Sequence, residues 1–240
     1  MDTLIDFFLE PYRNAPLYLI LLEIVAAGLG IASVLYAKKE NVLVFPTGII
    51  STTIYIYLLS QWNLYGDLII NIYYTIMSIY GWYLWSKVID SEKKKHIPIS
   101  RTTFKEKIIA LVIFIAASFF VIFIYRHYNV MPNDLNFTES IRFAYANLTS
   151  GNLERFRAAV PFLDTFTTAA AFVAMWLMAL KKIENWNFWI LTNIVSIPLY
   201  FVKGYGFTGI QYTIFLILAI QGYRLWKKTL SNPEVSGQIL

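Results

Sequence analysis

The stretch that decides the fold is NWNFWILTNIVSIPLYFVKGYGFTGIQYTIFLILAIQGYRLW, residues 185–226. It holds two apolar runs, 186–202 and 207–226, and each is long enough to cross the ~30 Å hydrocarbon core of a bilayer as a helix. Both runs also carry an amide, Asn193 in the first and Gln211 in the second, among tryptophans and tyrosines. A polar side chain in hydrocarbon is costly unless it faces protein or water, so these amides need a structural or functional reason.

The rest of the chain has the same character. Its 240 residues are 58% hydrophobic and 18% aromatic, and the mean hydropathy is +0.54. This is too apolar for an ordinary soluble domain, so the composition predicts an all-α integral membrane protein. Together with the two runs above, five more predict seven transmembrane helices, at 17–37, 41–59, 66–85, 108–124 and 162–180.

Several function classes are disfavoured by what the sequence lacks. There is no cysteine, and the two histidines, His96 and His127, fall outside the expected spans. We therefore predict no catalytic residue, no metal site, no cofactor and no enzyme activity. The acidic start of the chain lacks the basic region and the cleavage site of a secretory signal, so we expect the first helix to be retained.

The net charge of +5 is explained by topology and not by nucleic-acid binding. If the spans alternate, most lysines and arginines fall on one side, in basic clusters at 38–39, 87–107, 181–182 and 224–228. The positive-inside rule then places the amino terminus outside and the carboxyl terminus in the cytoplasm. The run KKKH at 93–96 is interpreted as a topology anchor.

Two parts of the chain resemble each other. KKEN at 38–41 matches KKIEN at 181–185, and GWYLWSK at 81–87 matches GYRLWKK at 222–228. The pattern predicts an N-terminal segment (1–16), a first three-helix repeat (17–87), a connecting region with a linker helix at 108–124 (88–161), a second repeat (162–228) and a tail (229–240). This 3+1+3 arrangement of parallel repeats predicts a site near the midplane between them.

Two local expectations follow from the same alignment and from the loops. Aligned through KKEN, Phe45 stands opposite Trp189, and Ile49 opposite Asn193. In the outward loop we expect Thr138, three residues before Ile141, to cap a short surface helix that runs through Asn147.

Helical spacing shows which side chains share a face. Polar and aromatic residues recur every three or four positions in the third, fifth, sixth and seventh spans. From these stripes we predict that the substrate-binding residues are Asn71, Tyr74, Thr75, Thr168, Trp176, Trp186, Trp189, Asn193, Gln211 and Tyr212. The alternative is that such groups only hold helices together by hydrogen bonds. Glu23, inside the first span, is interpreted as a proton-coupling site or as a partner of a neighbouring helix.

The block LDTFTTAAAFVAMWLMALKKIENWNFWILTNIVSIPLYFVKGY at 163–205, followed by GYRLWKK, closely resembles the PnuC family of bacterial vitamin B3 transporters. LYGDLIINIYYTIMSIYGWYLW at 64–85 resembles the matching part of the first repeat. The wider fold resemblance is to the SWEET sugar transporters, but the chain lacks the Pro-Gln dipeptide of their PQ-loop relatives, which weakens a sugar interpretation.

The two repeats predict alternating access at a midplane site. The resemblance implies facilitated diffusion of nicotinamide riboside across the bacterial inner membrane for NAD biosynthesis. It also implies a possible homo-oligomer, a trimer. The partners are then the substrate and the lipid bilayer, without nucleic acid. A transporter of another vitamin, nucleoside or small sugar, and a membrane receptor that does not transport, remain the alternatives.

Overall fold

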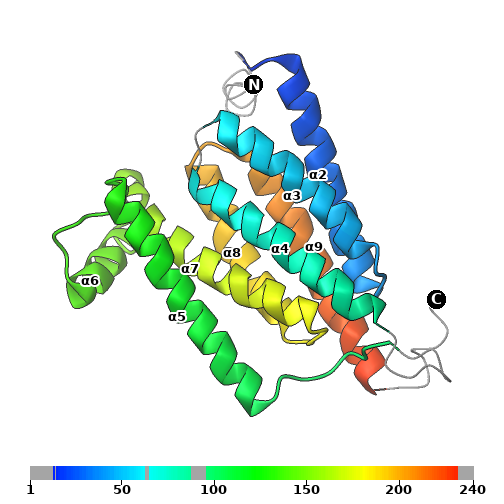
Figure 1. The fold of residues 1–240 in the computed structure, drawn as a ribbon. Helices are drawn as coiled ribbons and strands as arrows, with labels where there is room; N and C mark the ends of the chain where they lie inside the picture. Colours follow the sequence, from blue (N-terminus) through cyan, green and yellow to red (C-terminus); the bar gives the residue numbers. More distant parts are fainter. Residues whose placement is uncertain (1–12, 14, 63–64, 88–95, 232–240) are drawn as a thin grey trace.

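The computed structural model describes residue 13 and residues 15–62, 65–87 and 96–231. The described residues form eight α-helices (Figure 1). These are α2 (Leu17–Lys38), α3 (Val44–Gln61), α4 (Tyr65–Ser86), α5 (Phe104–His127), α6 (Phe137–Leu148), α7 (Leu153–Ala179), α8 (Asn185–Val202) and α9 (Gly206–Ser231). Each of the seven predicted spans therefore falls on a helix. The start of the chain at 1–12, most of the KKKH anchor and the end of the tail at 232–240 lie outside the described residues.

Three helices of the described chain, α2, α5 and α7, are long and apolar enough to cross a membrane. On α5, large apolar side chains such as Leu111, Phe119 and Phe123 are exposed on the surface of the chain. Exposed apolar area on this scale calls for apolar surroundings.

Helix α7 begins nine residues before the predicted span. Asn152 caps it, because its Oδ1 accepts hydrogen bonds from the backbone N–H groups of Glu154 (2.9 Å) and Arg155 (3.2 Å). The helix then continues through Pro161. Charged residues in the first turns lower the local hydropathy, so the hydropathy pattern placed the start of this helix too late in the sequence.

The cap of the short outer helix α6 was also predicted wrongly. Asn136 and not Thr138 is the N-cap, and the helix starts at Phe137. The Asn136 side chain accepts from the N–H of Glu139, and the Glu139 carboxylate accepts from the N–H of Asn136, both at 2.9 Å. This capping box satisfies two N–H groups that the helix leaves free, which fixes the earlier start.

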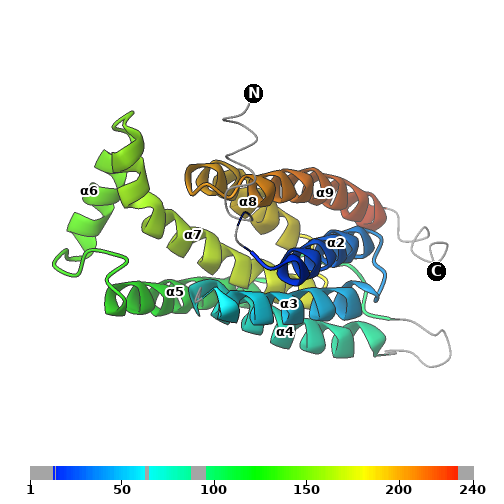
Figure 2. The same ribbon diagram turned by 90° about the horizontal axis from the view of Figure 1, so that it is seen from above.

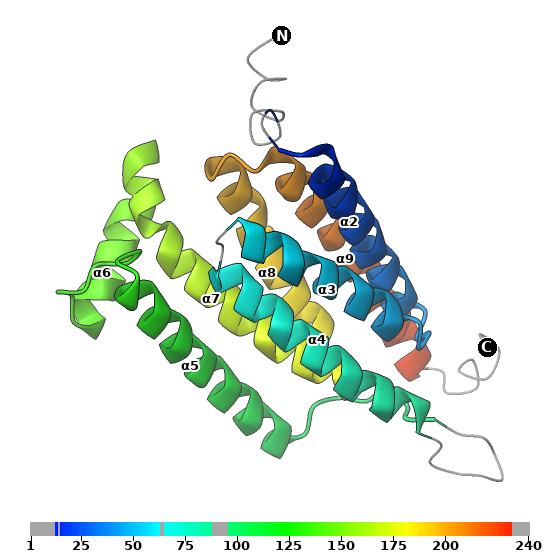
Figure 3. The same cartoon turned by 45° about the horizontal axis from the view of Figure 1, so that its top comes forward.

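The long helices form two groups of three. Consecutive helices pack within α2–α3–α4 and within α7–α8–α9, and the groups meet where α2 contacts α9 and where α4 contacts α7. Figure 2 shows α8 and α9 on one side of the molecule and α3 and α4 on the other. Helix α5 packs on α7 and lies along its outer side, remote from α2 and α9 (Figure 3).

The turns between the first two helices of each group have matching backbone geometry. Glu40 and Lys181 both have positive φ, at 58° and 56°. The N–H of Glu40 donates to the carbonyl of Ala37 (3.1 Å), and the N–H of Lys181 donates to that of Met178 (2.9 Å). The two turns are thus equivalent at the level of single hydrogen bonds.

Aromatic packing in the two groups also matches. A Cβ on Gly81 would collide with the Phe45 ring, and a Cβ on Gly222 would lie 2.6 Å from the Trp186 ring. These contacts make Phe45 equivalent to Trp186. The alignment through KKEN, which placed Phe45 opposite Trp189, is off by three residues, because Glu40 is equivalent to Lys181 and not to Glu184.

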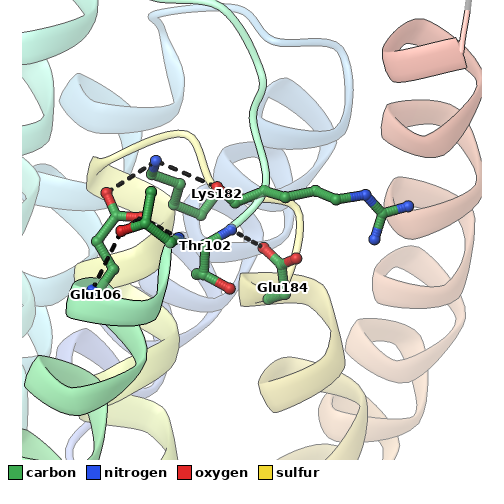
Figure 4. A network of polar contacts seen from close by, with 6 residues as sticks. Thr102, Glu106, Lys182 and Glu184 are labelled. Atoms are coloured by element: carbon green, nitrogen blue, oxygen red, sulfur yellow. Dashed lines mark hydrogen bonds and ion pairs between the residues drawn. The ribbon is translucent and has the colours of Figure 1, made fainter.

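The segment before α5 is tied to the turn between α7 and α8 (Figure 4). The N–H of Ser100 donates to the carbonyl of Lys181 (3.2 Å), and the N–H of Thr102 donates to the Glu184 carboxylate (2.9 Å). The ammonium group of Lys182 pairs with Glu106 at 2.8 Å. Through these contacts the start of α5 is attached to the second helix group.

Candidate functional site

A cavity of about 650 Å³ lies between the two helix groups. All six helices of the groups line it, and Tyr125 of α5 adds to one end. At that end the lining residues Trp62, Asp67 and Tyr205 are exposed. At the other end Ala37, Val44 and Trp186 line the cavity and are each 1% exposed. The cavity therefore opens at the end of Trp62 and is closed at the end of Trp186.

Most residues predicted for the site are brought together on this cavity. Eight of them line it, and they come from four different helices: Asn71, Tyr74, Thr168, Trp186, Trp189, Asn193, Gln211 and Tyr212. Asn193 is only 3% exposed, and it lies on the face of α8 that points into the cavity.

Two of the predicted residues are placed elsewhere. The Thr75 hydroxyl is hydrogen-bonded to the Thr52 hydroxyl (2.7 Å) and donates to the carbonyl of Asn71 (2.9 Å), so it joins α4 to α3. Trp176 packs against the buried cluster of Ala110, Val173 and Leu177, between α7 and α5. It lies on a face of α7 that turns away from the cavity, because α5 provides a second apolar surface for that helix.

Serine hydroxyls on the cavity wall connect α2 and α3. Ser51 donates to the carbonyl of Ala26, and Ser33 donates to that of Val44, both at 2.7 Å. Hydroxyls that are satisfied by backbone carbonyls support the helix-holding interpretation for these two residues.

Aromatic rings form much of the remaining wall. Tyr74 of the first group meets Trp189 of the second edge to face, with ring centroids 6.1 Å apart. Tyr200 and Tyr212 stack at 4.8 Å. The wall thus presents both ring faces and amide groups to the cavity, a combination that suits a flat ligand with polar substituents.

The closed end is built from four buried rings, Phe45, Trp85, Trp186 and Trp226, which we call the aromatic floor. Phe45 contacts Trp85 at 5.0 Å, Trp85 contacts Trp226 at 6.1 Å, and Trp226 contacts Trp186 at 5.5 Å. The contact between Trp85 and Trp226 joins the two helix groups. Within the described residues the Trp186 indole N–H is buried and makes no hydrogen bond.

Hydrogen bonds and an ion pair across the groups hold the floor together. The indole N–H of Trp85 donates to the carbonyl of Ala179 (3.2 Å), and that of Trp226 donates to the carbonyl of Ala37 (3.1 Å). Lys181 and Glu40, the two residues with positive φ, pair at 3.1 Å. The Lys181 ammonium also lies 4.8 Å from the centre of the Trp85 ring.

Carboxylates line the cavity too, and two of them, Asp67 and Asp164, are not among the predicted site residues. Glu23, Asp67 and Asp164 are all lining residues. Asp67 lies one turn before Asn71 on the same face of α4, so extending that stripe by four residues would have found it. Over the described residues no group of three or more His, Cys, Asp or Glu is arranged to hold a metal ion.

A family model described as nicotinamide mononucleotide transporter matches residues 20–228. The nicotinamide riboside transporter PnuC of Escherichia coli (strain K12) is 25% identical over 206 residues, which cover 85% of this chain and 84% of that protein. The riboflavin/roseoflavin transporter RibM of Streptomyces davaonensis is 23% identical over 164 residues, covering 67% of this chain and 65% of that protein.

The fold is similar to a solved structure, the crystal structure of the vitamin B3 transporter PnuC. The TM-score is 0.60 and the identity 22%, with 88% of this chain and 82% of that chain covered. The family match covers most of the chain, and the helical fold has apolar outer surfaces. Both observations indicate a multi-pass membrane protein. The chain belongs to the nicotinamide mononucleotide transporter family, a family of transporters and not of enzymes.

Proposed function

We propose that this protein takes up nicotinamide riboside by facilitated diffusion. The observation that carries the proposal is the cavity between the two helix groups, where Trp189 and Tyr74 from opposite groups meet beside Asn193. The names of the riboside transporters among its relatives support the same substrate.

The chemistry of the wall fits this ligand. A pyridinium ring is held by aromatic faces such as those of Trp189 and Tyr74, with cation–π attraction of order 0.5–2 kcal/mol each. The carboxamide and ribose hydroxyls match the donors and acceptors of Asn71, Asn193 and Gln211.

We also propose that all seven long helices span the membrane as a 3+1+3 arrangement, with α5 as the linker. The matching turns at Glu40 and Lys181, and the matching contacts of Gly81 and Gly222, support two equivalent three-helix units. Parallel repeats of this kind place a site near the midplane between them.

The transport mechanism that fits this arrangement is alternating access. The cavity opens at one end and is closed at the other by the aromatic floor, so the structure corresponds to one of the two states that such a mechanism requires. With the amino terminus outside, as the positive-inside rule predicts, the closed end faces the cytoplasm. Rocking of the two units would separate Trp85 from Trp226 and open that end.

Counterflow in liposomes tests the proposal. Vesicles that contain the purified protein and unlabelled nicotinamide riboside are expected to accumulate the labelled compound transiently, with no imposed proton or sodium gradient. Ionophores that collapse such gradients should leave the rate unchanged. Binding without counterflow would point to a receptor, and the proposal would then fail.

A second candidate is a vitamin of another class, because the relative RibM is named as a riboflavin/roseoflavin transporter. Competition separates the two. Unlabelled riboflavin, thiamine and nicotinamide are expected to leave the uptake of labelled nicotinamide riboside largely unchanged, whereas strong inhibition by riboflavin would favour the second candidate.

A further inference from the structure

The charged side chains on the cavity wall all have the same sign. Among the described residues, the lining includes Glu23, Asp67 and Asp164 but no lysine, arginine or histidine. The protein as a whole carries a net charge of +5. The charged residues that line the cavity are therefore negative, although the protein as a whole is positive. The overall composition does not explain this local excess of acidic residues.

Two of the carboxylates come from different helix groups and meet at the open end. Asp67 is on α4 and Asp164 is on α7, and each interacts electrostatically with Lys203, which follows α8. The Lys203 ammonium lies 2.7 Å from both carboxylate oxygens of Asp164. Side-chain exposure is 16% for Asp164 and 25% for Lys203, so this pair is partly shielded from water.

The pairing leaves the entrance with an excess of negative charge. Both oxygens of Asp164 hold the Lys203 ammonium, so the positive charge of Lys203 is balanced by that carboxylate. Asp67 adds a second carboxylate at the same end. In a cleft with walls of low dielectric, charges of one sign raise the local concentration of opposite charges and repel like ones, and such repulsion is an effective source of selectivity.

We propose that Asp67 and Asp164 are specificity-determining residues that favour a ligand with a positively charged ring and reject one that carries a phosphate. The inference rests on the proposed function and adds its electrostatic basis. A cationic nucleoside is attracted to the entrance, a neutral molecule of the same shape is not, and a phosphorylated form is repelled before it reaches the aromatic rings.

Nicotinamide riboside itself provides the test, because its oxidised form is a cation and its dihydro form is neutral with nearly the same shape. Binding of both forms and of the mononucleotide is measured on the purified full chain by competition against labelled riboside. For the wild type we expect at least tenfold preference for the cation over the dihydro form, and weaker binding still of the mononucleotide.

Asp67→Asn should lower the preference for the cation several-fold while affinity for the dihydro form stays the same. Asp164→Asn also leaves Lys203 without its carboxylate partner. The double variant Asp164→Asn with Lys203→Met removes both charges of the pair, so comparing it with the single variant separates the loss of the carboxylate from the effect of an unpaired lysine. Asp134→Asn, at an exposed position that does not line the cavity, is the matched control and should behave as the wild type.

The outcomes distinguish the two proposals. If the wild type binds both forms but the Asp67 and Asp164 variants keep the wild-type ratio, the electrostatic inference is overturned and the proposed function stands. The same holds if the mononucleotide binds as tightly as the riboside. If the wild type binds neither form of the riboside, the proposed function fails and this inference fails with it.

Discussion

Gly222 shows how a single residue without a side chain shapes the closed end of the cavity. The Trp186 ring lies against its Cα, and a Cβ there would be 2.6 Å from the nearest ring atom. Gly81 serves Phe45 in the same way in the first helix group. Two of the four rings of the aromatic floor, Phe45 and Trp186, can pack between helices because each has a glycine opposite it.

Replacing this glycine should therefore destabilise the protein. Gly222→Ala forces the buried Trp186 to move, and overpacking of this kind costs about 1–3 kcal/mol. Gly28→Ala is the matched control, because a Cβ at that position in α2 meets nothing within 4 Å, and alanine is the better helix former by about 1 kcal/mol. Thermal unfolding in detergent should show a lower midpoint for Gly222→Ala and an equal or higher midpoint for Gly28→Ala. Equal midpoints for both variants would contradict the packing argument.

Helix α8 has one face that lines the cavity and another that is exposed on the surface of the chain. Trp186, Trp189 and Asn193 follow each other at helical spacing and line the cavity, whereas Asn187 on the same helix is exposed and does not line it. The helix continues through Pro198, so the face is kept along its whole length.

The two asparagines of α8 provide a matched pair. Asn193→Ala removes a donor and an acceptor from the cavity wall and should weaken the binding of nicotinamide riboside about tenfold, which corresponds to ~1.4 kcal/mol. Asn187→Ala should leave affinity unchanged. Binding to the purified protein gives the affinities, and thermal unfolding without ligand shows that both variants are folded. Wild-type affinity in Asn193→Ala would remove this residue from the binding site.

In the whole molecule, the closed end depends on contacts between the two helix groups. The ion pair of Glu40 and Lys181 joins the equivalent turns, and Trp85 meets Trp226 beside it. Lys181 has a side-chain exposure of 9%, so its charge is largely removed from water. Loss of its partner would leave a buried charge uncompensated, which favours a state in which the end is open.

Glu40→Gln is therefore expected to shift the equilibrium toward opening on the closed side. Because the chain contains no cysteine, Ser78→Cys on the cavity wall is a clean reporter for thiol reagents that do not cross the membrane. Labelling from the side of the floor should rise roughly tenfold in Glu40→Gln, in line with a shift of about 1.4 kcal/mol between the two states.

Reversal of the pair controls this experiment. The double variant Glu40→Lys with Lys181→Glu restores opposite charges at the same two turns, and labelling should return toward the wild-type level. If labelling from the side of the floor is unchanged in Glu40→Gln, the ion pair does not hold this end closed.

The class of the protein, the approximate position of each long helix and most of the shared polar faces follow from the order of residues alone. Hydropathy and the 3.6-residue period are local properties, so they place Asn71, Asn193 and Gln211 on shared faces without knowledge of the partner helices. The same local information revealed the family resemblance, because its motifs are contiguous runs of sequence.

Only the tertiary structure decided what each face meets. Trp176 turns toward α5 and Thr75 toward Thr52, whereas Asp67 and Asp164 face one cavity from different helix groups. The rotation of a helix about its axis and its register against a distant helix depend on contacts between residues far apart in the chain. For that reason the pairing of Glu40 with Lys181 and the match of Phe45 to Trp186 appear in the fold but not in the sequence pattern.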